Sequence, residues 1–204
     1  IGRVPNTDAD WFRSSGLKLD ERGYVTVDGY GRTNLDGVWA LGDITPGHAL
    51  AHRAFEQGIT IAEKIAGADP KPVIDDTVPQ VVFSFPEAAS VGLTLDQAKA
   101  LEDVVEPKET AYPMLSNARM LMSGEGGSMT VVSGAFANNP DMQVVLGVHI
   151  VSPIASDLIA EAEQLVGNRV PLADAARLIH PHPTFSETLG EALLKADGRP
   201  LHTR

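Results

Sequence analysis

The 204-residue sequence predicts an α+β fold in which an antiparallel sheet is followed by helices. Two stretches, 128–136 and 143–151, are rich in apolar and β-branched residues, which is typical of strands. The segment Asn138–Asp141 between them has turn-forming residues, so the two strands should form a hairpin. Helical spacing of apolar residues dominates the chain after position 152. Strands and helices are therefore segregated along the sequence, which is typical of the α+β class.

The first part of the chain, residues 1–68, predicts short strands and one helix. Strands are expected at Tyr24–Val27 and Val38–Leu41, the second ending at Gly42 and Asp43. Apolar residues at positions 51, 54, 55, 59, 62 and 65 follow helical spacing, so this helix should bury them. Gly67 is a plausible end for the helix.

A proline-containing linker at 68–72 separates a second domain, residues 69–204. This domain should open with a strand at Gln80–Ser84. The pattern Thr94-Leu-Asp-Gln97 is a capping box, in which each of two side chains accepts a hydrogen bond from the other residue's backbone, and it predicts a helix reaching Leu101.

Three helices are predicted after the hairpin. The first should be capped by Ser152, with Pro153 as its first residue, and run through Leu165. The second should extend over Pro171–Ile179. The third should open at Thr184 and bury an apolar stripe, made up of Leu189, Leu193 and Leu194.

Composition excludes several classes of function. The net charge of −11 argues against binding to nucleic acid, because such proteins need clustered Lys and Arg. The sequence has no Cys, so it contains no disulfide framework and no thiol chemistry of its own. No apolar run reaches the roughly 18 residues of a membrane span, and no secretion signal is apparent. A cytoplasmic location without membrane partners is therefore expected.

His182 and Glu187 are the candidate catalytic residues. A histidine that donates one ring N–H to a carboxylate keeps its other nitrogen as a base that titrates near neutral pH. The five-residue spacing allows this pairing if His182 lies in a loop and Glu187 in the first turn of the following helix. Alternatively, Thr184 and Glu187 form only a capping box, and His182 is an ordinary loop histidine.

The sequence contains two further candidate sites. His180 and His182 form a His-x-His pair that can bind zinc, with His202 as a third ligand, but no fourth ligand has suitable spacing, and no metal is predicted. Asp43 stands at the end of a predicted strand, where a carboxylate can bind the hydroxyls of a sugar. It is equally able to cap the segment that follows.

Four segments together resemble the class I flavoprotein disulfide reductases. In chain order they are Gly2-Arg-Val-Pro-Asn6, Thr33–Asp43 with its ending Val-Trp-Ala-Leu-Gly-Asp, Leu50–Gly58, and His182-Pro-Thr-Phe-Ser-Glu187. The resemblance extends over essentially the whole chain. The His-x-His-Pro-Thr form and the Leu-Ala-His segment are most similar to those of dihydrolipoamide dehydrogenases.

The resemblance implies a homodimer in which each subunit has an FAD-binding, an NAD-binding and an interface domain. It also implies a reaction in which NAD+ oxidises dihydrolipoamide. The substrate would be the lipoyl group of a 2-oxoacid dehydrogenase complex. Residues 1–68 would be the end of the NAD and FAD domains, and 69–204 the interface (dimerisation) domain. Asp43 would hold the ribityl hydroxyls of FAD, the amide of Ala51 would approach the isoalloxazine, and Gly2 would lie near the nicotinamide cofactor. Gly42 and Pro183 are assigned to the same cofactor sites.

The resemblance also implies roles for the catalytic pair. His182 would take a proton from the substrate thiol, while Glu187 would orient the imidazole and stabilise its charged form. This pair would act on the redox disulfide of the partner subunit.

Several segments of that family have no counterpart in this sequence. The redox Cys pair, the N-terminal Gly-x-Gly-x-x-Gly and the NAD-binding βαβ unit are missing. The chain is therefore expected to be the C-terminal part of a larger flavoenzyme, inactive alone and with little or no affinity for FAD. Alternatives are a mercuric, quinone or glutathione-type reductase, a stand-alone dimerisation module, or a metal-dependent hydrolase using His180, His182 and His202.

Overall fold

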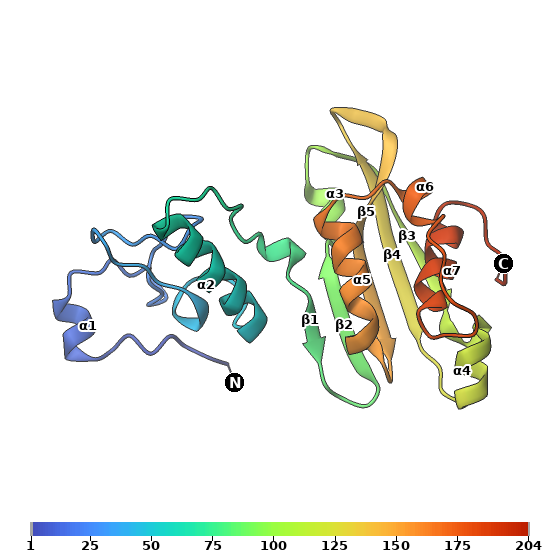
Figure 1. Cartoon of the computed structure of the whole chain (residues 1–204), viewed down its shortest axis with the longest axis horizontal. Helices are drawn as coiled ribbons and strands as arrows, with labels where there is room; N and C mark the ends of the chain where they lie inside the picture. Colours follow the sequence, from blue (N-terminus) through green and yellow to red (C-terminus); the bar gives the residue numbers. More distant parts are fainter. Residues whose placement is uncertain (1, 204) are drawn as a thin grey trace. The chain divides into compact units, whose positions relative to one another are not determined.

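The computed structural model describes residues 2–203, so Ile1 and Arg204, the outer ends of the two predicted domains, lie outside the described residues. The chain forms two compact units, the first ending at Asp75 and the second beginning at Asp76 (Figure 1). No helix in the described part of the chain is long and apolar enough to cross a membrane.

The first unit consists mainly of turns, with two helices and a one-turn 3-10 helix. These are α1 (Asp10–Ser14), η1 (Gly42–Ile44) and α2 (Ala51–Ile65). Its core is small and centres on Phe12, Val25 and Ala40. α1 was not predicted, because five residues are too few to reveal a helical period.

The prediction of two strands in this unit is wrong. The segments at 24–27 and 38–41 each make a single bridge, Leu19 with Val25 and Arg32 with Trp39. Aspartate side chains explain why no longer ladder forms. Asp28 Oδ1 accepts hydrogen bonds from the backbone N–H groups of Tyr30 and Arg32. Such local bonds give the backbone an alternative to pairing in a sheet.

α2 is confirmed as a helix, but the prediction of its buried face is wrong. The side chains of Phe55, Ile59 and Ile65 are 71%, 53% and 63% exposed. The opposite face is buried instead and carries Arg53, Thr60 and Ile61. Its polar groups have partners within the unit, because Arg53 donates to Asp75 and Gln57 accepts from the N–H of Gly42.

The second unit contains a five-stranded, fully antiparallel sheet in the order β1-β2-β5-β4-β3. The strands are β1 (Gln80–Val82), β2 (Glu87–Gly92), β3 (Val104–Pro113), β4 (Ser128–Phe136) and β5 (Asn139–Ser152). The predicted fold class, an antiparallel sheet with segregated helices, is confirmed.

The predicted hairpin is present as β4 and β5, but its turn comes earlier than expected. Phe136 pairs with Asn139, so only residues 137 and 138 form the turn, and Pro140 lies within the exposed start of β5. β2 and β3 were not predicted. β3 lies at the edge of the sheet, and its register shifts between Val105 and Lys108, which breaks the alternation that would reveal a strand.

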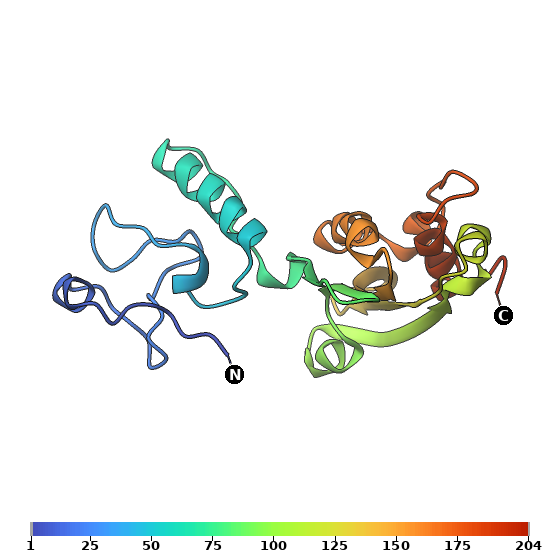
Figure 2. The same cartoon turned by 90° about the horizontal axis from the view of Figure 1, so that it is seen from below.

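Helices cover both faces of this sheet (Figure 2). One face carries α5 (Ala155–Gly167), α6 (Leu172–Ala175) and α7 (Glu187–Ala196), and the opposite face carries α3 (Leu95–Ala100). A short helix, α4 (Ala118–Ser123), and 3-10 turns at Asp75–Thr77 and Met114–Ser116 complete the unit. The main core lies under α5 and α7, where Met129, Ile150 and Leu193 are buried.

The helix boundaries differ from the predictions at three places. α5 starts after Ile154 rather than after Ser152, because β5 continues through Ser152. α6 ends at Ala175 instead of reaching Ile179. α7 begins at Glu187, three residues later than predicted from Thr184.

The predicted capping box of α3 is confirmed. Thr94 Oγ1 accepts from the N–H of Gln97, whose Oε1 lies 2.8 Å from the N of Thr94. Thr94→Ala is expected to lower the free energy of unfolding by about 0.5–2 kcal/mol, because it leaves an N–H of the first turn without its partner. Urea unfolding followed by far-UV circular dichroism measures the effect. Thr94→Ser keeps the hydroxyl and is the matched control; equal stability of the two variants would contradict the prediction.

Candidate functional site

The structure brings His182 and Glu187 together at the start of α7. His182 lies in the loop before the helix and Glu187 is the first helical residue, so the five-residue spacing is bridged as expected. His182 Nδ1 is 2.8 Å from Glu187 Oε1. The imidazole side chain is 69% exposed and the carboxylate 18% exposed. The imidazole is thus held at one nitrogen by a mostly buried carboxylate and is otherwise accessible.

The loop around His182 is fixed by further hydrogen bonds. Thr184 donates its N–H to Glu187 Oε2 at 2.7 Å and its hydroxyl to the carbonyl of Pro181. The buried Asn117 donates from its amide to the carbonyl of Thr184, 67 residues away in sequence. Glu187 therefore serves two partners at once, His182 and the backbone of Thr184. The capping-box alternative is wrong, because the N-cap of α7 is Ser186 and not Thr184.

The carboxyl group of Glu187 is held in its ionised form. Burial raises its pKa, but the N–H of Thr184, the hydrogen bond from His182 and the charges of His182 and His180 outweigh burial, and the pKa lies below its usual value. A lowered pKa in the folded state contributes stability that is present above the unfolded pKa of about 4.3 and is lost as the pH falls through the folded value. Glu187 is therefore an acceptor for His182 throughout the neutral range.

The other two histidines considered for a metal site have different partners. His180 Nε2 lies 2.8 Å from Glu161 Oε1 on α5. His202 Nδ1 lies 2.7 Å from Glu191 Oε1, one helical turn beyond Glu187. Among the described residues, no group of three or more His, Cys, Asp or Glu side chains could hold a metal ion. Each histidine belongs to its own imidazole–carboxylate pair.

Tyr112 was not anticipated from the sequence. Its side chain is fully buried on β3, and its hydroxyl has no hydrogen-bond partner among the described residues. Burial and the negative charges of Glu191 and Glu187 raise the pKa of this hydroxyl well above its usual value. Tyr112 is therefore a neutral group beside the two carboxylates of α7. Its position in a strand that was not predicted explains why it was missed.

The residues predicted for FAD binding lie together in the first unit. Gly42 opens η1 with φ +73°, a left-handed conformation that favours glycine, and a Cβ built there would contact the Cβ of Ala54 at 3.4 Å. The turn that carries Asp43 thus packs against the first turn of α2. Asp43 is exposed. Ala51 is the first residue of α2, whose N-cap residue Leu50 makes no side-chain hydrogen bond to the helix.

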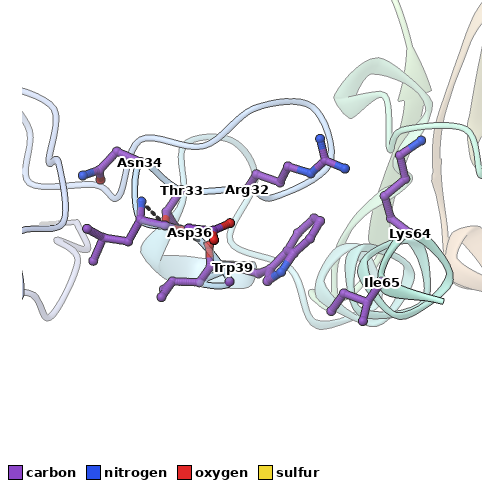
Figure 3. Close-up of a pocket in the computed structure, with 10 residues that line it drawn as sticks. Arg32, Thr33, Asn34, Asp36, Trp39, Lys64 and Ile65 are labelled. Atoms are coloured by element: carbon purple, nitrogen blue, oxygen red, sulfur yellow. Dashed lines mark hydrogen bonds between the residues drawn. The ribbon is translucent and has the colours of Figure 1, made fainter. Parts of the chain in front are cut away.

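The remaining cofactor candidates lie elsewhere. Gly2 is exposed in a segment without regular secondary structure before α1. Pro183 follows His182 through a cis peptide bond. A hollow of about 630 Å³ lies in the first unit, and the guanidinium of Arg32, one of its lining residues, is 5.2 Å from the centre of the Trp39 ring. Figure 3 shows both side chains. Gly42, Asp43 and Ala51 do not line this hollow.

The two units match two models of the same protein family. Residues 78–193 match the model described as "Pyridine nucleotide-disulphide oxidoreductase, dimerisation domain". Residues 1–58 match the model described as "Pyridine nucleotide-disulphide oxidoreductase". The chain belongs to the pyridine nucleotide-disulphide oxidoreductase family. The family resemblance inferred from the sequence is confirmed, and the second unit contains the dimerisation domain of this family of oxidoreductases.

Individual members of the family are similar over nearly the whole chain. A dihydrolipoyl dehydrogenase of Cupriavidus necator is 42% identical over 99% of the chain, and one of Geobacillus stearothermophilus is 38% identical over 99%. The crystal structure of LpdA from Mycobacterium tuberculosis superposes on 96% of the chain with a TM-score of 0.85 and 31% identity. The chain spans 41–42% of the length of these two curated relatives and 41% of the LpdA chain.

Proposed function

We propose that this chain is the C-terminal part of a homodimeric dihydrolipoyl dehydrogenase, which oxidises dihydrolipoamide with NAD+. In this proposal residues 1–68 complete the FAD and NAD domains, and residues 69–204 are the dimerisation domain. The observation that carries the proposal is the 2.8 Å pair of His182 and Glu187, placed within the region that matches the family's dimerisation domain. A cytoplasmic location, expected from the sequence, remains a prediction.

His182 acts as the base in this proposal. Glu187 is ionised and accepts the hydrogen bond at Nδ1, so the proton of the neutral imidazole resides on Nδ1 and Nε2 is free to accept one. A substrate thiol that reaches Nε2 loses its proton there and becomes the thiolate, which is the nucleophile in thiol–disulfide exchange. Glu187 then stabilises the imidazolium that results.

The disulfide that the thiolate attacks must come from outside these 204 residues, because the sequence contains no Cys. His182 is largely exposed, so this side of the second unit is accessible to another polypeptide. Two apolar residues close to His182 in sequence, Leu178 and Ile179, are 49% and 96% exposed. A partner subunit that covers Ile179 and supplies the disulfide accounts for both observations.

The turn of Gly42 and Asp43 and the start of α2 fit part of a flavin site. The exposed carboxylate of Asp43 suits sugar-alcohol hydroxyls, and the positive end of the α2 helix dipole near Ala51 suits an electron-rich ring edge. Gly2 is proposed to lie near the nicotinamide cofactor, and Pro183 is proposed to lie near the flavin. Both proposals rest on the family resemblance alone. FAD, when bound, passes electrons between the disulfide and NAD+.

The exposed apolar stripe of α2 also supports a larger protein. Phe55, Ile59 and Ile65 are exposed on the part of the helix surface that lies away from the buried Arg53, Thr60 and Ile61. Such a stripe is normally buried against another element. In the proposal, the remainder of the cofactor-binding domains covers it.

The proposal is tested with the full-length enzyme that contains this chain. We expect a flavin absorption spectrum and NAD+ reduction that depends on reduced lipoamide. The 204-residue chain is the control and should show neither, because it has no disulfide and only part of the flavin site. Turnover of mercuric ion, a quinone or oxidised glutathione in preference to lipoamide would replace the proposal with one of those reductases. A folded, flavin-free full-length dimer would instead indicate a dimerisation module.

A further inference from the structure

His180 is buried between two helices, just ahead of the loop that carries His182. Its side chain is 9% exposed, and its Nε2 lies 2.8 Å from Glu161 Oε1 on α5. Glu161 and His180 are 19 residues apart in sequence. The contact therefore joins the end of the segment after α6 to a helix that packs on β2 and β5.

The opposite side of the His180 ring lies against the backbone of α7. A Cβ built at Gly190 would be 2.5 Å from His180 Nδ1 and 2.8 Å from its Cε1, closer than real Cβ atoms approach. Glycine is an unfavourable residue in the interior of a helix. Its presence at position 190, in the middle of α7, is explained by the space that the imidazole requires.

Charge strengthens this arrangement. The hydrogen bond to Glu161 raises the pKa of His180, and this effect, together with the charges of Glu161 and Glu187 and a hydrogen bond to the carbonyl of Leu178, exceeds the opposing effect of burial. The positive charge of His180 is in turn one of the causes that lower the pKa of Glu187. The groups that face His180 are thus Glu161 from α5, Glu187 from α7 and the backbone of Leu178.

Only Pro181 separates His180 from His182, and a proline has a nearly fixed φ. We propose that Glu161 and His180 form a positioning unit, which clamps the segment before α7 between α5 and α7 and so fixes the place of the His182 imidazole. This inference rests on the proposed function, in which His182 is the catalytic base. Neither Glu161 nor His180 is expected to touch the substrate.

The first test concerns the clamp itself and does not depend on activity. Histidines of the 204-residue chain are labelled with 13C, and their pKa values are measured by NMR titration. Glu161→Gln should lower the pKa of His180, because it removes the main cause of its increase. The control is Glu163→Gln, which makes the same change on the same helix at a residue whose described hydrogen bond is with Gln164. An unchanged His180 titration in Glu161→Gln would overturn the proposal.

The second test concerns positioning and uses the full-length enzyme. Glu161→Gln should lower kcat with reduced lipoamide by about 10- to 100-fold, because small displacements of a catalytic group are costly. KM should change less than about twofold, and reduction of an artificial dye by NADH, which bypasses His182, should be unchanged. The double variant Glu161→Gln with His180→Gln should be no slower than His180→Gln alone, since the pair acts as a unit.

The outcomes separate this inference from the proposed function. If His182→Gln abolishes lipoamide turnover while Glu161→Gln leaves kcat unchanged, the function stands and the positioning role is wrong. If Glu161→Gln lowers kcat only in proportion to a loss of folded dimer, the pair is merely structural and the inference is again wrong. If His182→Gln has no effect, the proposed function itself fails.

Discussion

His182→Gln in the full-length enzyme should lower kcat with reduced lipoamide by about 10²–10⁴-fold, the range that a positioned general base contributes. Gln has no nitrogen that accepts a proton near neutral pH, so the substrate thiol would have to ionise unaided. Stopped-flow reduction of the flavin by reduced lipoamide measures the step directly. Reduction of the flavin by NADH should stay within about twofold of the wild-type rate, because it does not require a base at this position.

His202→Gln is the matched control for this variant. His202 forms the second imidazole–carboxylate pair of α7, with Glu191, one turn away from the first. Its loss removes the same chemical group from the same helix without removing the proposed base. Equal effects of the two substitutions, or a His182→Gln enzyme with more than a tenth of wild-type activity, would contradict the catalytic role.

Leu193→Ala should cause the largest loss of stability among the substitutions considered, about 2–5 kcal/mol in the free energy of unfolding. Leu193 is fully buried in the main core, on the helix that carries Glu187. Truncation removes apolar contacts and leaves a cavity under α7. Urea unfolding of the 204-residue chain, followed by far-UV circular dichroism, measures the change.

Leu121→Ala is the control, since the side chain of Leu121 is 63% exposed on α4. This substitution should alter the free energy of unfolding by less than about 0.5 kcal/mol. A loss under about 1 kcal/mol for Leu193→Ala would mean that α7 is not packed on the sheet as described.

Local patterns in the sequence predicted α3, α5, α6, α7 and the hairpin of the second unit, since their signals come from neighbouring residues, whereas the short α4 was not predicted. The capping box at Thr94 and Gln97 is an example, because both of its hydrogen bonds lie within four residues. The buried face of α2 could not be predicted in this way. It depends on Asp75, which lies 22 residues after Arg53 and attracts a polar side chain inward. Hydrophobic periodicity contains no information about such a partner.

In the candidate site too, contacts between residues close in sequence could be predicted, and contacts between distant residues could not. His182 and Glu187 were recognisable because their pairing spans five residues and lies within a motif of the family. The pairing of His180 with Glu161 spans 19 residues, and the position of Tyr112 beside the carboxylates of α7 depends on the packing of a helix on an edge strand. Both require knowledge of which elements are neighbours in space.

The order of strands in the sheet affects how the second unit folds during synthesis. β2 pairs with β5, not with the strand that follows it, and Glu87 pairs with Ser152, 65 residues later in the chain. A nascent chain that ends before β5 therefore holds a β1–β2 ribbon and a β3–β4 ribbon with no strand to join them. Pairing β2 with β5 closes a loop of about 65 residues, which is entropically costly. During synthesis, His182 and Glu187 emerge only after all five strands of the sheet on which α7 packs.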